Sequence, residues 1–186
     1  MNEKRSLKPK IAWLACALAL VISAAGLPSA RAERFTATLV NPERGGTTQV
    51  VIGIERYSTP AEIKKLSGIL ASKGPDALRE ALWDLEKGYI RVGNSLGYPI
   101  AVATSTPTAN GQVIHIMMDR QISFREFATG ARSLDYPFSY IEVKLGKDGK
   151  GEGQMFAAAK ISLTAGTVDV ENYNFVPLKL LSVRAR

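Results

Sequence analysis

The stretch "FSYIEVKLGKDGKGEGQMFAAAKISL", residues 138–163, decides the fold that the sequence predicts. Residues 141–145 alternate apolar and charged side chains, and the same two-residue period returns from residue 155 onward. Such alternation is typical of a strand that buries one face. Between the two runs, Asp148-Gly149 favours a tight hairpin turn, because both residues tolerate the positive φ angles that the turn needs. We therefore expect two antiparallel strands joined at this dipeptide.

The glycine-rich loop at residues 145–154 does not match the patterns of phosphate- or calcium-binding loops. A phosphate-binding loop that starts at Gly146 would need a lysine where Glu152 stands. A calcium loop that starts at Asp148 would need a glutamate at its twelfth position, which Ala159 occupies. The loop is therefore interpreted as a turn without a ligand.

The two-residue period recurs along most of the chain after residue 33. Short turn-forming pieces separate the segments that follow it, so we expect antiparallel strands with short connections. These nine segments are residues 34–40, 47–58, 89–93, 98–105, 112–119, 138–146, 153–163, 167–173 and 176–184.

A helical period replaces the alternation between residues 60 and 87. Thr59 and Glu62 have the spacing of a capping box, which marks the start of a helix. The dipeptide Gly74-Pro75 interrupts the helical pattern. We therefore predict a helical hairpin over about residues 60–87, inserted after the second strand.

Together these elements predict a single α+β domain over residues 33–186. Its main part is an antiparallel β-meander that closes as a barrel or a sandwich, because closure protects the edges of a sheet. The segment 120–137 is longer and irregular, with room for one helical turn at residues 124–128.

The first 32 residues have the organisation of a secretory signal peptide. A basic segment precedes mostly apolar residues 11–25, and Ala30-Arg31-Ala32 fits the cleavage motif. The apolar run is shorter than the roughly 20 residues that a membrane-spanning helix needs. We expect cleavage after Ala32, export to the periplasm or beyond the cell, and no stable transmembrane anchor after processing. Cys16 leaves lipoprotein processing as an alternative.

Loss of the leader changes the composition on which function is judged. The whole chain has 24 basic and 17 acidic residues, a net charge of +7. The leader holds five of the basic residues and Glu3, so the processed chain has 19 and 16, a net charge of +3 over 154 residues. This charge does not predict a nucleic-acid-binding stripe. The single cysteine also lies in the leader, so the processed chain has no thiol chemistry.

The sequence contains no recognisable catalytic motif, and no catalytic residue is assigned. His115 is the only histidine and lies within an alternating strand. One histidine without cysteine argues against a structural zinc site, and we predict no metal and no cofactor. Carboxylates on or beside the strands leave open a pair that works as in glycosidases.

Two groups of residues are candidates for ligand binding. Residues 132–140 bring three aromatic side chains beside a charged pair, which suits an apolar or carbohydrate-like ligand; alternatively, these aromatics enter the core at the start of a strand. Arg56, Arg91 and Arg120 stand near strand ends and would bind an anion if they met in space. The candidate residues are Tyr89, Arg91, His115, Asp119, Arg120, Asp135, Tyr136, Phe138 and Tyr140.

Several pieces of the chain, in this order, carry a resemblance to a known family. They read "NPERGGTTQVVIGIERYSTPAE", "KGYIR", "DRQISF", "DYPFSYIEVKL", "GKGEG", "AAKI" and "ENYNFVPLKLLSVR". The chain resembles an uncharacterised family of exported bacterial proteins over nearly all of its processed length. The resemblance implies one exported domain and brings no activity or substrate. Related sequences read Asp-Arg-Pro-Ile where this chain has Gln121 in place of the proline.

These features lead to one main hypothesis and two alternatives. The main hypothesis is a non-enzymatic ligand-binding or interaction module of the cell envelope, with a small apolar ligand or another envelope protein as its partner. The first alternative is a carboxylate-dependent hydrolase or isomerase that uses Asp119 with Arg120, or Asp135 with Tyr136. The second is an envelope protein with a purely structural role.

Overall fold

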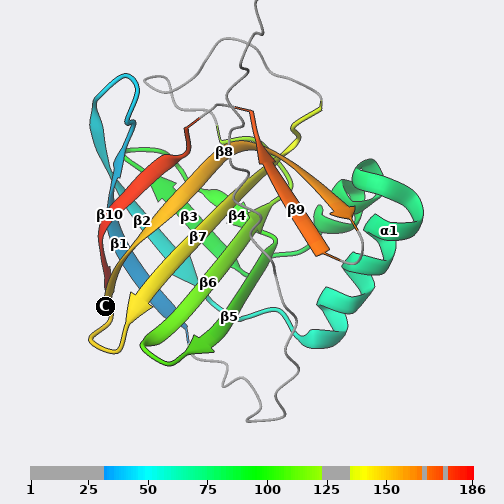
Figure 1. The fold of residues 1–186 in the computed structure, drawn as a ribbon, viewed down its shortest axis with the longest axis horizontal. Helices are drawn as coiled ribbons and strands as arrows, with labels where there is room; N and C mark the ends of the chain where they lie inside the picture. Colours follow the sequence, from blue (N-terminus) through cyan, green and yellow to red (C-terminus); the bar gives the residue numbers. More distant parts are fainter. Residues whose placement is uncertain (1–31, 123–134, 165–166, 174–175) are drawn as a thin grey trace, which may run out of the picture.

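The computed structural model describes residues 32–122, 135–164, 167–173 and 176–186. The predicted leader at 1–32 (apart from its last residue) and the predicted helical turn at 124–128 lie outside these residues. The described residues form one helix and ten strands, and the strands belong to a single antiparallel sheet (Figure 1). The elements are β1 Glu33–Val40, β2 Thr47–Ile54, α1 Pro60–Leu82, β3 Gly88–Val92, β4 Tyr98–Ile100, β5 Val102–Thr108, β6 Gly111–Met118, β7 Phe138–Gly146, β8 Lys150–Thr164, β9 Thr167–Asn172 and β10 Leu178–Ala185.

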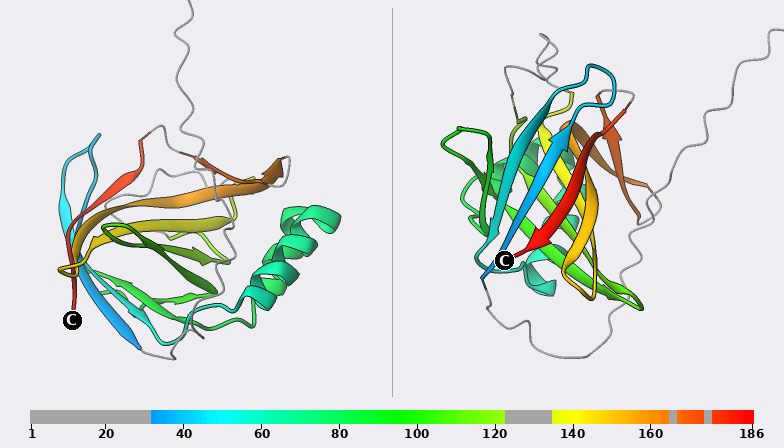
Figure 2. Two further views of the ribbon diagram at one scale, coloured as in Figure 1. Left: turned by 60° about the horizontal axis from the view of Figure 1, so that its bottom comes forward. Right: turned by 90° about the vertical axis from the view of Figure 1, so that its left-hand side faces the viewer.

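The sheet curls into a nearly closed barrel (Figures 1 and 2). Its strands run in the order β4-β3-β2-β1-β10-β8-β7-β6-β5, and β9 pairs with β8 outside this path. The two ends of the path, β4 and β5, are separated only by Ala101, whose backbone N–H donates to the carbonyl of Met117 at 3.0 Å. Of the two forms left open by the sequence, barrel or sandwich, the structure shows a nearly closed barrel, and α1 follows the second strand as predicted.

One predicted strand is two strands in the structure. Residues 98–105 were expected to be continuous, but β4 pairs with β3 whereas β5 pairs with β6. The chain changes its partner at Ala101, and this change joins the two edges of the sheet. A period of two cannot reveal such a change, because it reports which face a residue occupies and not which neighbour it pairs with.

The hairpin that the opening stretch predicts is present between β7 and β8. Gly149 adopts φ 71° and its N–H donates to the carbonyl of Gly146 at 3.0 Å. Asp148 supports the turn, because its Oδ1 accepts the N–H of Lys150 at 3.1 Å. Beyond the barrel, β8 continues to Thr164 and forms a second hairpin with β9.

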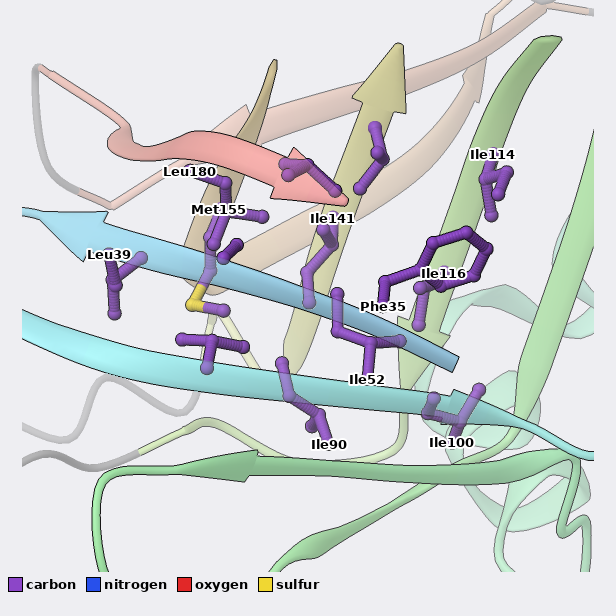
Figure 3. Close-up of a cluster of buried hydrophobic side chains, with 14 of the residues drawn as sticks. Phe35, Leu39, Ile52, Ile90, Ile100, Ile114, Ile116, Ile141, Met155 and Leu180 are labelled. Atoms are coloured by element: carbon purple, nitrogen blue, oxygen red, sulfur yellow. The ribbon is translucent and has the colours of Figure 1, made fainter. Parts of the chain in front are cut away.

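Aliphatic side chains fill the interior of the barrel (Figure 3). They come from the inward positions of the strands, as alternation requires, and several have no exposed surface. The largest contributors include Phe35, Leu39, Ile52, Ile54, Ile90, Ile100, Ile114, Ile116, Ile141, Met155 and Leu180. The barrel is therefore held together by a packed core rather than built around an open lumen.

Helix α1 begins as predicted but ends earlier. The Thr59 side chain accepts the backbone N–H of Glu62, and the Glu62 carboxylate accepts the backbone N–H of Thr59 at 2.7 Å. Gly74 has φ 83°, so the helix kinks there ahead of Pro75. The predicted break between two helical segments is thus present at Gly74 within α1, but the second segment ends at Leu82 and not near residue 87. Residues 83–87 connect the helix to β3, and the last of them, Lys87, is buried.

A second apolar cluster attaches α1 to the outside of the barrel. Leucines of the helix pack on outward side chains of the sheet and on the extension of β8 (Figure 2, left). Its buried members are Leu66, Leu70, Leu78, Leu82, Ala101, Val102, Phe138, Ala159 and Ile161. The inner face of the sheet thus lines the barrel core. Its outer face packs against the helix where α1 covers it.

Lys87 is a buried anchor between the helix and the barrel. Its side chain is 1% exposed, and its Nζ donates to Oε1 of Glu62 at 2.5 Å. Its backbone N–H donates to the carbonyl of Ile100 at 2.7 Å, and its own carbonyl accepts the N–H of Glu55 at 2.8 Å. The bond from Lys87, followed by the bond from the Thr59 backbone, lowers the pKa of Glu62. The ion pair therefore fixes the first turn of α1 against the end of the barrel.

Candidate functional site

The structure distributes the candidate residues over five regions. Tyr89 and Arg91 lie on β3, whereas His115 and Tyr140 meet across β6 and β7. The remaining polar candidates follow β6 or precede β7, and Phe138 is fully buried beneath α1. No common concavity therefore collects all of them among the described residues, and each region is described in turn.

Tyr89 and Arg91 point outward from the barrel, because Ile90 between them points into the core. The Tyr89 hydroxyl accepts a hydrogen bond from Nη2 of Arg34 on β1 at 2.9 Å. The guanidinium carbon of Arg91 lies 5.6 Å from the centroid of the Tyr89 ring. Tyr89 is thus held between two arginines, one from its own strand and one from two strands away.

Gly53 explains how Tyr89 reaches β1. It lies opposite Tyr89 on the intervening strand β2. A Cβ atom at Gly53 would stand 2.6 Å from Cε1 and 2.8 Å from Cζ of the Tyr89 ring. The ring therefore lies across β2 in space that any side chain at Gly53 would occupy, and an isolated glycine within a strand is the sequence sign of such an approach.

Further cations join Arg34 and Arg91 on the same side of the barrel. The backbone N–H of Arg186 donates to the carbonyl of Arg34 at 2.8 Å. A bulge at Ser182, which has φ 53°, turns Val183 into the core and its neighbour Arg184 outward. We call the exposed residues Arg34, Arg91, Lys150, Arg184 and Arg186 the cationic face.

Strand register places three of these cations in one row across the barrel surface. Paired positions run from β3 through β2, β1 and β10 to β8, and neighbouring strands are about 4.8 Å apart. The row consists of Arg91, Val51, Thr36, Arg184 and Lys150. Figure 2 (right) shows β1, β2 and β10, three of the strands that carry it, side by side.

Few acidic groups oppose this charge. Within β1, β2, β3 and β10 the one acidic residue is Glu33, which shares the inward phase of Phe35 and accepts a hydrogen bond from the Tyr57 hydroxyl at 3.0 Å. Burial, with Glu33 as a second cause, raises the pKa of Tyr57. Asp148 lies at the rim, 3.7 Å from Lys150. The cationic face therefore presents an excess of positive charge, which favours an anionic partner.

Asp119 and Arg120 form a pair beyond the end of β6. Nε of Arg120 lies 2.9 Å from Oδ1 of Asp119, and Nη2 lies 3.0 Å from Oδ2. The bond to Asp119 raises the pKa of Arg120, whose guanidinium also stands over the Trp83 ring at 5.7 Å. Arg120 thus binds both carboxylate oxygens of the buried Asp119. We interpret the pair as a structural ion pair. Arg120 is therefore bound to an acid, unlike the arginines of the cationic face.

Tyr136 belongs to a separate aromatic group near β9. Its hydroxyl donates to Oε1 of Glu171 at 2.5 Å, and its ring packs edge-on against Tyr173 with centroids 5.3 Å apart. The bond to Glu171 raises the pKa of Tyr136. Gln121 donates to the carbonyl of Tyr136 at 2.7 Å and thereby tethers this segment. Asp135 precedes it.

His115 and Tyr140 lie on the outer face of the sheet. Nδ1 of His115 is 2.6 Å from the Tyr140 hydroxyl, and their rings stack with centroids 6.0 Å apart. Glu142 pairs with His115 across the strands and lies 3.0 Å from Nζ of Lys144. Burial is the main reason why the pKa of His115 is lowered; Glu142 acts in the opposite direction. The imidazole is therefore neutral at pH 7.

Sequence reasoning did not find Arg34, Arg184 and Arg186, nor the role of Gly53. The arginines stand far apart in the chain, and the register brings Arg34 to Tyr89 and places Arg184 on the neighbouring strand β10, with Arg186 after it. Among the described residues there is no group of three or more histidine, cysteine or acidic side chains able to hold a metal ion. In the same residues, no helix has the length and apolar character needed to cross a membrane.

Comparison of the chain with models of protein families, with curated proteins and with solved structures gives no match in any of the three. The resemblance to exported bacterial proteins accordingly stays a prediction. The function has to be argued from the geometry of the site itself.

Proposed function

We propose that the protein is an exported, non-enzymatic binding module of the cell envelope, and that its cationic face binds an anionic partner. The observation that carries this proposal is the group of exposed cations Arg34, Arg91 and Arg184, with Arg186 just after β10, on strands whose one acidic residue faces inward. Exposed charges of one sign repel one another, and a bound anion relieves that repulsion. The packed interior supports a binding surface on the outside of the barrel rather than a ligand inside it.

Binding to immobilised anionic polymers tests the proposal. In about 10 mM salt, where the Debye length is roughly 30 Å, the protein should bind dextran sulfate and not dextran, and about 1 M salt should release it. The variant Arg34→Gln/Arg91→Gln/Arg184→Gln should bind at least tenfold more weakly. The matched control is Lys64→Gln/Lys65→Gln/Lys73→Gln, which removes the same charge from exposed positions of α1.

Two results would count against the proposal. Equal weakening in both triple variants would mean that net charge alone drives binding, without a defined face. Absence of binding to any anionic polymer at low salt would remove the anionic partner altogether.

One observation favours a second candidate function, a carboxylate-dependent hydrolase or isomerase. Tyr140, the neutral His115 and the buried carboxylate of Glu142 lie together on the outer face of β6 and β7, and such groups serve as acids and bases. Turnover of a panel of activated esters that is lost in both Tyr140→Phe and Glu142→Gln would support it. If the purified protein turned over none of these esters, the enzyme candidate would be ruled out and only the binding function would remain.

A further inference from the structure

Tyr89 indicates which kind of anion the cationic face takes. Within β1, β2, β3 and β10 it is the one aromatic side chain that points outward, since Phe35 points into the core. Its ring is only partly buried. A partner recognised by charge alone would make no use of an aromatic surface at this place.

The Tyr89 ring is fixed in position before any partner binds. Its hydroxyl is bonded to Arg34, and the absent side chain of Gly53 leaves room for the ring across β2. The guanidinium of Arg91, an exposed side chain of the same strand, lies over the ring, 5.6 Å from its centroid. A rigid aromatic surface flanked by two guanidinium groups is pre-organised, so little conformational entropy is lost on binding.

A ligand that contacts both kinds of group must combine an apolar ring face with an anionic substituent. A tyrosine ring offers apolar area with a polar end, and arginine binds a carboxylate through two parallel hydrogen bonds. A sugar ring that carries a carboxylate has both features in one unit. An acidic peptide matches the arginines but lacks the rigid ring.

The shape of the surface argues against a lipid bilayer. The cationic face lies on the outside of a barrel and is convex, and its row of paired positions spans four strand spacings, roughly 19 Å. A flat surface touches only part of such a row at one time. A flexible chain follows the curvature and places successive charges near Arg91, Arg184 and Lys150.

We infer that Tyr89, Arg34 and Arg91 form a subsite for one carboxylate-bearing sugar of an acidic polysaccharide, whose chain continues along the cationic face. The inference rests on the proposed function and names the class of its partner. The sugar ring packs on Tyr89, and the carboxylate accepts hydrogen bonds from the arginines.

Calorimetric titration with a short oligogalacturonate tests the inference. The oligogalacturonate should bind, and its methyl ester, which has the same rings without the charge, should not. Tyr89→Leu should weaken binding about tenfold, a change of about 1.4 kcal/mol, and Tyr89→Phe should weaken it less because the ring is kept. Tyr173→Leu, at a partly exposed tyrosine near β9, is the control and should bind as the original protein does.

Poly-L-glutamate and vesicles that contain phosphatidylglycerol separate this inference from the proposed function. Tyr89→Leu should weaken the binding of poly-L-glutamate clearly less than that of oligogalacturonate, because the arginines that bind carboxylates remain. Equal loss for both polymers, no loss for oligogalacturonate, or tighter binding to the vesicles would overturn the sugar subsite. The anionic-partner proposal would survive those results if Arg34→Gln/Arg91→Gln still weakened binding, and would fail with the subsite if no anionic probe bound.

A second measurement covers the case in which Tyr89→Leu does not fold. In proton NMR of oligogalacturonate with the unaltered protein, ring protons of the sugar that packs on Tyr89 should shift upfield because of the aromatic ring current. The methyl ester at the same concentration serves as the control. Bound oligogalacturonate without such shifts would refute the contact with Tyr89.

Discussion

Replacement of Glu62 should destabilise the protein more than replacement of Lys87, although the two residues form one ion pair. The Lys87 side chain is 1% exposed, whereas that of Glu62 is 32% exposed. Glu62→Ala leaves a buried ammonium without its partner, and breaking a buried pair in this way costs about 3–5 kcal/mol. Water can approach from the exposed side of Glu62, so we expect the lower end, about 3 kcal/mol.

Lys87→Met has a milder effect for the same physical reason. Methionine keeps most of the aliphatic volume, and the remaining carboxylate of Glu62 still accepts the backbone N–H of Thr59 and is partly hydrated. We expect a loss of about 1 kcal/mol, close to that of an exposed pair. The double variant should be about 1–2 kcal/mol more stable than Glu62→Ala alone, because it no longer buries an unpaired charge.

Urea unfolding followed by far-UV circular dichroism measures these free energies by linear extrapolation. Glu80→Ala, at an exposed position of the same helix, is the control and should change stability by less than about 0.5 kcal/mol. Equal losses for the two single variants, or a double variant as unstable as their sum, would refute the reasoning. Either result would mean that Lys87 is not held as a buried charge by Glu62.

Three further substitutions test other parts of the structure by the same unfolding measurement. His115→Gln should make the free energy of unfolding less dependent on pH. The pKa of His115 is lowered from 6.5 in the folded state, so the unfolded chain binds the extra proton more readily. In the original protein, stability therefore falls as pH drops below about 6.5. A profile identical to that of the original protein would contradict this. Gly53→Ala should cost about 1–3 kcal/mol because the new methyl group clashes with the Tyr89 ring. Tyr89→Leu in the same chain should restore part of this loss. No recovery would show that the clash lies elsewhere. Ser139→Ala should cost about 1 kcal/mol because it removes a buried hydroxyl that accepts the N–H of Ile122 and donates to the carbonyl of Arg120, while the N–H of Ile122 keeps its bond to the carbonyl of Ala157; a neutral effect would rule out the hydroxyl as a contributor.

Local patterns in the sequence were sufficient for the elements of the fold. The hairpin at Gly149, the capping box at Glu62 and the break at Gly74 are each set by neighbouring residues, and each is present. The change of partner at Ala101 was missed, because it depends on strands that are distant in the sequence. The end of α1 was placed too late for a related reason: in the sequence Lys87 has the appearance of an exposed helical residue, and its burial against Glu62 depends on the fold.

The binding surface could be predicted only in part. Tyr89 and Arg91 were found because they lie two positions apart, near the end of one strand. Arg34, Arg184 and Arg186 were not found, because their proximity arises from the pairing of β1 with β2 and β10. The net charge of the chain was also a poor guide, since acidic residues elsewhere cancel the cations that the register gathers. Gly53 was a readable sign, because a lone glycine in a strand marks a close approach.

The outward positions of the barrel strands show why the two halves of the outer surface differ. On β7 and β8 these positions include Phe138 and Phe156, and the leucines of α1 pack over this side. On β1, β3 and β10 the corresponding positions carry Arg34, Arg91 and Arg184, which are exposed. A covered face requires apolar side chains, but an exposed face needs only polar ones, and polar residues of either charge would satisfy the fold. The choice of one sign on the exposed half is therefore not explained by folding, whereas the anionic partner that we propose would account for it.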